Sequence, residues 1–211
     1  MESDALQKLA LWLSPGYPVG AFAYSHGVEW AVSEGLISDA ASAGGWIEGA
    51  LRHGAGRTDA ILAAAAWRAP ESEEPADLAR ALAASAERLT ETEDQGAAFA
   101  AVTSAAFGPE MPAAPYPVAF GRAARAHGAP LLPALTLFLQ AFAGNLMSAA
   151  VRLVPLGQTE GQKALARLLP LCAELAAEAA EAPLDAAGGA ALLSDIAAMR
   201  HETLQTRLFR T

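Results

Sequence analysis

The four histidines are the side chains of this sequence best suited to proton transfer or metal binding. They are His26, His53, His127 and His201. No two of them lie four residues apart and none belongs to a His-Glu-x-x-His pattern, so the spacing does not indicate a zinc protease. A lone histidine is more often a hydrogen-bonded structural residue. Two alternatives stay open: a nickel site assembled by the fold, and a small helical enzyme of unknown substrate that uses His26 or His201.

Candidates for a nucleophile are few. The single cysteine, Cys172, lies in an apolar stretch, where a thiol is usually an inert packing residue. Ser25 precedes His26 outside any Gly-x-Ser-x-Gly elbow, and the sequence has no Walker A motif. The carboxylates between residues 87 and 94 form an acidic helix surface, which is either a solvated face or a patch that meets a basic partner. We therefore expect no catalytic, cofactor-binding or metal-binding residues in this chain.

The composition narrows the possible partners. The chain has 211 residues, of which 53% are apolar and 18% charged, and its formal net charge is −9. A general nucleic-acid binder needs a basic face that neutralises phosphates, so we expect no nucleic-acid partner. A low charged fraction leaves apolar surface available for protein interfaces. One cysteine provides no disulfide framework, which favours a cytoplasmic protein.

The start of the sequence and one long apolar stretch bear on membrane association. Residues 1–4 are acidic rather than basic, and no long apolar stretch follows, so we expect no signal peptide. Residues 129–151 carry no formal charge and approach the length of a membrane span. Prolines at the start of this stretch and Gln140, Asn145 and Ser148 within it favour a buried central helix instead. We expect no membrane partner.

Nearly every other segment has helical spacing of its apolar residues, and none has the period of a strand. The sequence therefore predicts an all-α fold: a compact multi-helix bundle with a flexible N-terminus and a flexible C-terminal tail, as a single domain over residues 1–211. Asp39 is suited to cap a helix. A further helix is expected over residues 76–90 and is extended, or restarted after Gly96, through residue 107. A bend is expected at Pro170.

Residues 14–30 combine glycines, prolines and aromatic residues before a helical pattern begins. The prolines exclude a regular helix at residues 15–18, and the glycines permit backbone angles that other residues avoid. Tyr17, Phe22, Tyr24 and Trp30 supply large apolar anchors. A loop of defined shape is therefore expected here.

This segment also resembles the N-terminal signature of the UreF family of urease accessory proteins. Five blocks of the sequence resemble the family in the right order, namely residues 13–30, 87–99, 117–121, 145–159 and 201–211. The chain carries Gly16 and Tyr17 where the family usually has a small residue and Leu, Val28 where it has Leu, and Thr211 where it ends in Ser. Each block alone is weak, but the ordered set covers most of the chain.

The resemblance implies an all-helical, usually dimeric scaffold without catalytic activity of its own. Proteins of this family bridge a second accessory protein, UreD (also called UreH), and the GTPase UreG, and together they deliver nickel to apo-urease. GTP, Mg²⁺ and nickel are thereby implied only through the partner complex. The resemblance also implies that the scaffold governs GTP hydrolysis by UreG.

The resemblance further implies which residues contact partners. The tail from His201 to Thr211 is expected to become ordered on docking to UreD/UreH, with Phe209 buried and the arginines paired. The loop from Pro18 to Glu29 is expected to contact UreG or a second copy, with Tyr24, Ser25 and Glu29 favoured over Phe22 for this role. The alternative is that Phe22, Tyr24 and Trp30 fill the core. The full expected set is Pro18, Gly20, Tyr24, Ser25, Glu29, Arg152, Gln158, His201, Glu202, Arg207, Leu208, Phe209 and Arg210.

Overall fold

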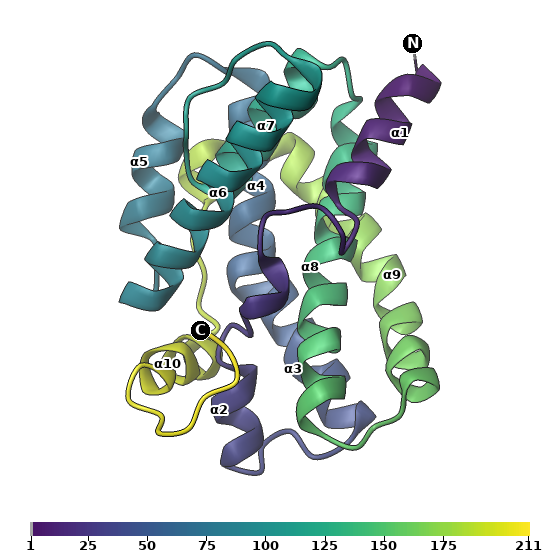
Figure 1. Cartoon of the computed structure of the whole chain (residues 1–211), viewed down its shortest axis with the longest axis vertical. Helices are drawn as coiled ribbons and strands as arrows, with labels where there is room; N and C mark the ends of the chain where they lie inside the picture. The colour runs from purple at the N-terminus through teal and green to yellow at the C-terminus, as the bar shows by residue number, and fades with distance from the viewer. Residues whose placement is uncertain (1) are drawn as a thin grey trace.

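The computed structural model describes residues 2–211, and these are arranged as a bundle of helices (Figure 1). Its α-helices are α1 (Glu2–Trp12), α2 (Val28–Ser33), α3 (Ala40–His53), α4 (Ala55–Arg68), α5 (Glu74–Ala81), α6 (Ala86–Phe107), α7 (Tyr116–Ala126), α8 (Leu131–Leu153), α9 (Gln158–Glu181) and α10 (Leu192–His201), with short 3₁₀ helices η1 (Ala21–Ala23) and η2 (Leu184–Ala186). No strand occurs within residues 2–211. The predicted all-α, compact bundle is confirmed.

Helix α4 lies inside the bundle and packs against α3, α7, α8 and α9. Small side chains make this possible, because every residue from Ala60 to Ala66 is buried and all but two of them are alanine. Gly121 on α7 completes the contact, since a Cβ at this position would lie 2.3 Å from the carbonyl oxygen of Ala63. The alanine-rich composition thus serves close helix packing.

Two helix boundaries differ from the prediction. The expected helix over residues 76–90 is divided between α5 and α6, because Ser85 caps a new helix by accepting a hydrogen bond from the Arg88 amide at 3.1 Å. Helix α6 then continues through Gly96 to Phe107 without a restart. Asp39 caps α3 as predicted, in a reciprocal capping box with Ser42. Helix α9 continues through Pro170 to Glu181.

Helix α8 is the one helix of residues 2–211 that is long and apolar enough to cross a membrane by length and composition. Half of its most apolar window is buried within the protein, including Leu135, Leu139 and Leu146. The opposite side carries Gln140, Asn145 and Ser148 along a cavity described below. Helix α8 is therefore a core helix on one side, as predicted, and a cavity wall on the other.

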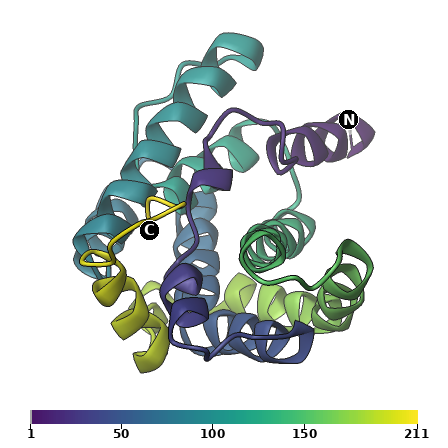
Figure 2. The same ribbon diagram turned by 60° about the horizontal axis from the view of Figure 1, so that its bottom comes forward.

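Both ends of the described chain are packed against the bundle. Leu9 and Trp12 of α1 are buried. Residues 202–211, called the tail from here on, run across the segment that precedes α2 (Figure 2), and Phe209 and Thr211 are buried there. In this conformation both ends are packed against their own chain, and the expected ordering of the tail on docking to a partner stays a prediction. The tail is held in this position because buried carboxylates of its own chain accept its hydrogen bonds.

Candidate functional site

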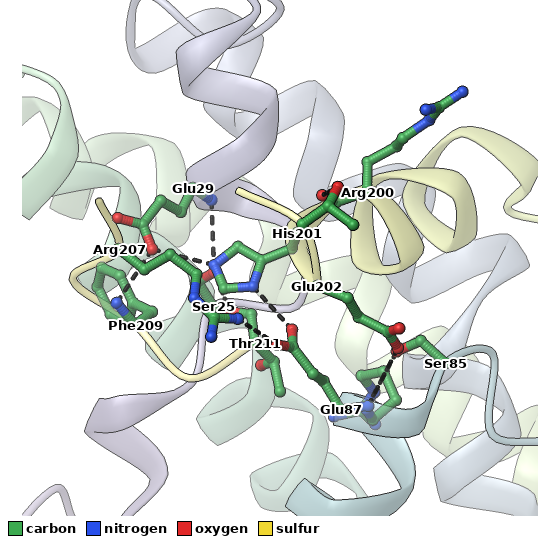
Figure 3. Close-up of polar contacts among 12 residues, drawn as sticks. Ser25, Glu29, Ser85, Glu87, Arg200, His201, Glu202, Arg207, Phe209 and Thr211 are labelled. Carbon is green, nitrogen blue, oxygen red and sulfur yellow. Dashed lines mark hydrogen bonds and ion pairs between the residues drawn. The ribbon is translucent and has the colours of Figure 1, made fainter. Parts of the chain in front are cut away.

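The N-terminal signature, the start of α6, the end of α10 and the tail converge in one polar site (Figure 3). Ser25 and Glu29 come from the segment before α2 and from α2 itself, Glu87 from α6, and His201 from α10. The tail supplies backbone amides and the side chains of Arg207 and Thr211. The site therefore joins parts of the sequence that are more than 170 residues apart.

Backbone geometry before α2 allows α10 to approach. Gly27 has φ 76° and His26 has φ 52°, so the chain turns sharply through the left-handed region. A Cβ on Gly27 would lie 2.7 Å from the amide nitrogen of Ala198 on α10. The contact between α2 and α10 thus depends on glycine at this position, and it places His201 next to Glu29.

His201 is fully buried and each of its ring nitrogens faces a carboxylate. Its Nε2 lies 3.0 Å from Oε2 of Glu29, and its Nδ1 lies 2.8 Å from Oε2 of Glu87. Both contacts are complete hydrogen bonds only when the ring carries two protons. We call these three residues the His201 clamp. It leaves His201 no free ring nitrogen for acid–base catalysis, which favours a structural role over the alternative of a His201-centred enzyme.

The carboxylate of Glu29 also holds the tail. It accepts hydrogen bonds from the backbone amides of Leu208 at 2.7 Å and Phe209 at 3.0 Å. Arg207 donates to Glu87, so the tail contacts both carboxylates of the His201 clamp. Hydrogen bonds to a charged acceptor are about twice as strong as those between neutral groups.

A second group of charges, the buried charge cluster of His26, Arg88 and Glu91, lies beside the clamp. His26 Nε2 is 2.7 Å from Oε1 of Glu91, and Arg88 Nη1 is 2.6 Å from its Oε2. Burial raises the pKa of Glu91, but Arg88 and then His26 outweigh it and lower the value to about 2. Burial, together with Arg88, lowers the pKa of His26, which disfavours the charged form of this ring. Glu91 is therefore ionised and balanced chiefly by Arg88.

Thr211 connects this cluster to the end of the tail. Its hydroxyl donates to Oε2 of Glu91 at 2.9 Å, and its backbone oxygen accepts from the amide of Ser25 at 2.9 Å. The Ser25 hydroxyl donates to the same oxygen. Glu91 thus receives hydrogen bonds from three parts of the chain.

Asp59 on α4 is a second carboxylate near Arg88, at 3.9 Å from its Nη2. Burial raises the pKa of Asp59 to about 6, with Arg88 opposing and Glu91 adding to the shift. The ionised form is therefore disfavoured in the folded protein. Asp59 also lines the cavity described next.

We expect Asp59→Asn to stabilise the protein at pH 7. The pKa of about 6 in the folded state lies above the ordinary 3.8, so the folded state binds more protons between these values and stability falls as pH rises through them. The shift corresponds to at most about 3 kcal/mol at pH 7 and roughly half of that at pH 5. Urea denaturation at several pH values measures this gain.

Asp185→Asn is the control for this experiment, because Asp185 is exposed. Its free energy of unfolding is expected to stay within about 0.5 kcal/mol of the parent protein at each pH. A gain in Asp59→Asn that does not shrink toward acid pH would show that the carboxylate is not the source of the cost.

A cavity of about 700 Å³ opens between α1, the N-terminal loop, α8 and the start of α9. Trp12, Tyr17 and Phe138 are among its apolar walls, and the buried charge cluster with Asp59 lies at its polar end. Four polar residues of α8 line it together, namely Gln140, Asn145, Ser148 and Arg152. Within residues 2–211, no group of three or more His, Cys, Asp or Glu side chains is arranged to hold a metal ion.

The expected partner-binding residues divide by exposure. Tyr24, Ser25, Glu29, His201 and Phe209 are buried, so in this conformation they contact their own chain. The loop aromatic residue that faces solvent is Phe22, at 67% exposure, rather than Tyr24, at 3%. Tyr24 has a core position in this conformation, and its hydroxyl lies 3.4 Å from Asp94. Its expected role in partner binding stays a prediction.

The remaining expected residues lie on the surface. Gly20 turns the loop at φ 75°. Glu202 accepts hydrogen bonds from the amides of Ala86 and Glu87, which attaches the end of α10 to the start of α6. Arg210 lies 3.9 Å from Asp94. The other exposed members are Pro18, Arg152, Gln158, Arg207 and Leu208, whose contacts with partners stay predictions.

Arg152 connects α8 to both the loop and the tail. Its Nη2 donates to the backbone oxygen of Phe22 at 2.9 Å, and its guanidinium lies 4.4 Å from the ring centroid of Phe209. Leu208, next to Phe209, is 78% exposed. Phe22 and Leu208 are thus exposed apolar residues on the two segments that Arg152 connects, in a chain of net charge −9. Phe22, Arg152 and Leu208 are called the tail surface below.

Three residues of this site were not predicted from the sequence, namely Glu87, Arg88 and Glu91. Sequence reasoning placed the two glutamates on a solvated acidic face, whereas Glu91 is 2% exposed. Their positions in the second family-like block were the available signal. Cys172 is buried, and burial raises the pKa of its thiol to about 11, which agrees with the packing role expected for it.

Comparison with known proteins yields one family. The UreF family model matches residues 37–169. Proteins named urease accessory protein UreF match nearly the whole chain: the one from Cereibacter sphaeroides strain KD131 is 64% identical over 99% of this chain and 100% of its own length. The protein from Roseobacter denitrificans is 51% identical over 100% of this chain and 96% of its own length. The protein from Ruegeria pomeroyi is 48% identical over 96% of this chain and 95% of its own length.

Proposed function

Because this chain belongs to the UreF family of urease accessory proteins, we propose that it is a non-catalytic scaffold that links the accessory protein UreD/UreH to the GTPase UreG. In this role it supports GTP-dependent delivery of nickel to apo-urease in the cytoplasm. GTP, Mg²⁺ and nickel are bound by the assembled complex, and nickel is cargo rather than a resident cofactor of this chain. The scaffold acts as a homodimer.

The observation that carries this proposal is the tail surface. Phenylalanine and arginine are enriched in protein interfaces. Arg152 contacts the backbone of the exposed Phe22 and the ring of Phe209, which is next to the exposed Leu208. Phe22 and Leu208 come from the first and last family-like blocks, so the surface draws together the parts of the sequence most typical of the family. We assign UreD/UreH to this surface.

The experiment is size-exclusion chromatography with light scattering. The protein is mixed with UreD/UreH and UreG in the presence of GTP and Mg²⁺. A stable peak with the mass of all three proteins supports the scaffold role, and the mass of the protein alone measures the dimer. Separate peaks for every mixture would contradict the proposal.

Phe22→Ala and Leu208→Ala are expected to weaken binding of UreD/UreH by about 2 kcal/mol each, as interface hot spots do. Both side chains are exposed, so the melting temperature should be unchanged. Titration by calorimetry or biolayer interferometry measures the dissociation constant.

Leu132→Ala is the matched control, because Leu132 is a 47% exposed leucine at the start of α8, away from the tail. Its affinity should equal that of the parent protein. Point substitutions are sharper here than deletion of residues 207–211, since the deletion would also expose the buried carboxylates Glu29 and Glu91. Unchanged affinity in both tail-surface variants would remove this surface from the interface.

A further inference from the structure

The cavity between α1, α8 and the start of α9 has the size and composition of a small-molecule site, and the scaffold role does not use it. Its volume of about 700 Å³ lies within the range of about 300–1,000 Å³ that is typical of such sites. Aromatic rings from three segments line it, namely Trp12 from α1, Tyr17 from the N-terminal loop and Phe138 from α8. Apolar walls of this kind bind the apolar body of a ligand, while a few polar groups fix its orientation.

Packing outside the cavity holds two of these rings in place. Phe99 is fully buried, and its ring centroid lies 5.8 Å from the centroids of Trp12 and of Tyr17. A hydrogen bond of 2.8 Å also joins the hydroxyl groups of Tyr17 and Thr103. This part of the wall is therefore formed before a ligand arrives, which lowers the entropic cost of binding.

The polar end of the cavity holds more negative than positive charge when its carboxylates are ionised. Arg88 lies 2.6 Å from Glu91, so these two groups balance each other. His26 does not supply a further positive charge, because burial and Arg88 lower its pKa and disfavour the charged ring. Asp59 therefore remains as a carboxylate without a cation of its own.

The carboxylate of Asp59 has no hydrogen-bond partner within residues 2–211. Its contact with Nη2 of Arg88, at 3.9 Å, is too long for a hydrogen bond. The side chain is 18% exposed and lines the cavity, so a ligand in the cavity can reach it. Burial raises the pKa of Asp59 to about 6, as expected for a carboxylate whose charge is incompletely compensated.

We propose that this cavity binds a small organic cation, an amine or amidine that donates hydrogen bonds to Asp59 and packs its apolar body against the aromatic wall. The cation completes the charge balance at the polar end, where Arg88 is already paired with Glu91. An anion would instead add negative charge beside Asp59, and a neutral ligand of the same shape gains the apolar contacts alone. All of these residues belong to one chain, so the site requires none of the partners proposed above.

The test is calorimetric titration of the full-length protein at pH 7 with three probes that share a phenyl ring. Benzamidine is positively charged, benzamide is neutral and benzoate is negatively charged. We expect one benzamidine to bind per chain, with an affinity at least about tenfold higher than that of benzamide, because its hydrogen bonds to Asp59 join two charged groups. Benzoate should not bind. The proposal is overturned if benzamidine does not bind, if benzamide binds equally well, or if benzoate binds more tightly.

Asp59→Asn removes the carboxylate charge and is expected to raise stability at pH 7, so unfolding does not complicate this variant. Its affinity for benzamidine should fall at least about tenfold. Asp185→Asn is the matched control, because Asp185 is exposed, and its affinity should equal that of the parent protein. Affinity of the parent protein in Asp59→Asn would remove Asp59 from the site and overturn the proposal.

The indole N–H signals of the tryptophans locate the bound probe by NMR. Of the four tryptophans, Trp12 lines the cavity, whereas Trp46 lies on α3 and does not line it. Saturation with benzamidine should shift the Trp12 signal and leave the Trp46 signal unchanged. An unchanged Trp12 signal would place the probe outside the cavity and would also overturn the proposal.

Discussion

Glu91→Gln is expected to lower the free energy of unfolding by about 3–5 kcal/mol, since it removes one partner from a buried ion pair and leaves Arg88 uncompensated. Glu91 is 2% exposed and receives contacts from His26, Arg88, Gln95 and Thr211. Glutamine has nearly the same volume as glutamate, so the loss of stability reports the removal of the charge. Urea denaturation at pH 7 measures it.

Glu93→Gln is the control on the same helix, because Glu93 is 37% exposed and pairs with Arg80 at the surface. The Glu93→Gln substitution should lower the free energy of unfolding by less than about 1 kcal/mol. A double variant, Arg88→Met with Glu91→Leu, should recover part of the stability, since burying no charge avoids the desolvation cost. Equal losses in Glu91→Gln and Glu93→Gln would contradict the description of a buried charge cluster.

The buried pair of Glu91 and Arg88 also predicts how the stability of the parent protein responds to acid. The pKa of Glu91 in the folded state, about 2, lies below the ordinary value of 4.5. The stability that it contributes is therefore present above pH 4.5 and is lost as pH falls through about 2. Glu91→Gln should lack this component of acid unfolding.

Gly96→Ala has the second large expected effect. A Cβ at this position of α6 would lie 1.8 Å from the backbone oxygen of Ala114 and 2.8 Å from the amide nitrogen of Tyr116. Neither backbone atom moves without displacing the segment that leads into α7. We expect the free energy of unfolding to fall by about 3 kcal/mol or more, at the upper end of the cost of overpacking.

Gly45→Ala is its matched control within α3. Nothing lies within 4 Å of a Cβ at Gly45, so the substitution should stabilise the protein by about 0.5–1 kcal/mol through helix propensity. Thermal or urea denaturation should show changes of opposite sign in the free energy of unfolding of the two variants. A Gly96→Ala protein as stable as the parent would show that α6 and the segment before α7 are not in backbone contact.

Helix positions were predictable from sequence where the signal is local. Asp39 caps α3 through side-chain contacts with a residue three positions away. The helical spacing of apolar residues is likewise a pattern among near neighbours in the sequence. The break before Ser85 is also local but was missed, because the residues around it have good helix propensity on both sides. Propensity alone does not choose between one long helix and two capped ones.

The candidate site was only partly predictable, for a reason that His201 illustrates. Its importance was expected from the family resemblance, yet its partners Glu29 and Glu87 lie 172 and 114 residues away in the chain. Exposure was predicted least well, because Glu91 was placed on an acidic helix surface and is buried. The burial of a carboxylate depends on whether a distant arginine reaches it.

By itself, the sequence determined the all-α class, the family and the segments that matter, because helix spacing, capping and short motifs are encoded within a few neighbouring residues. Only the tertiary structure decided that the tail lies on the loop before α2, and that Glu29, Glu87 and Glu91 hold it. The contact of α2 with α10 depends on Gly27, where the absence of a side chain allows two backbones to meet. A buried charge is stable only where packing brings its partner, and packing is a property of the whole chain.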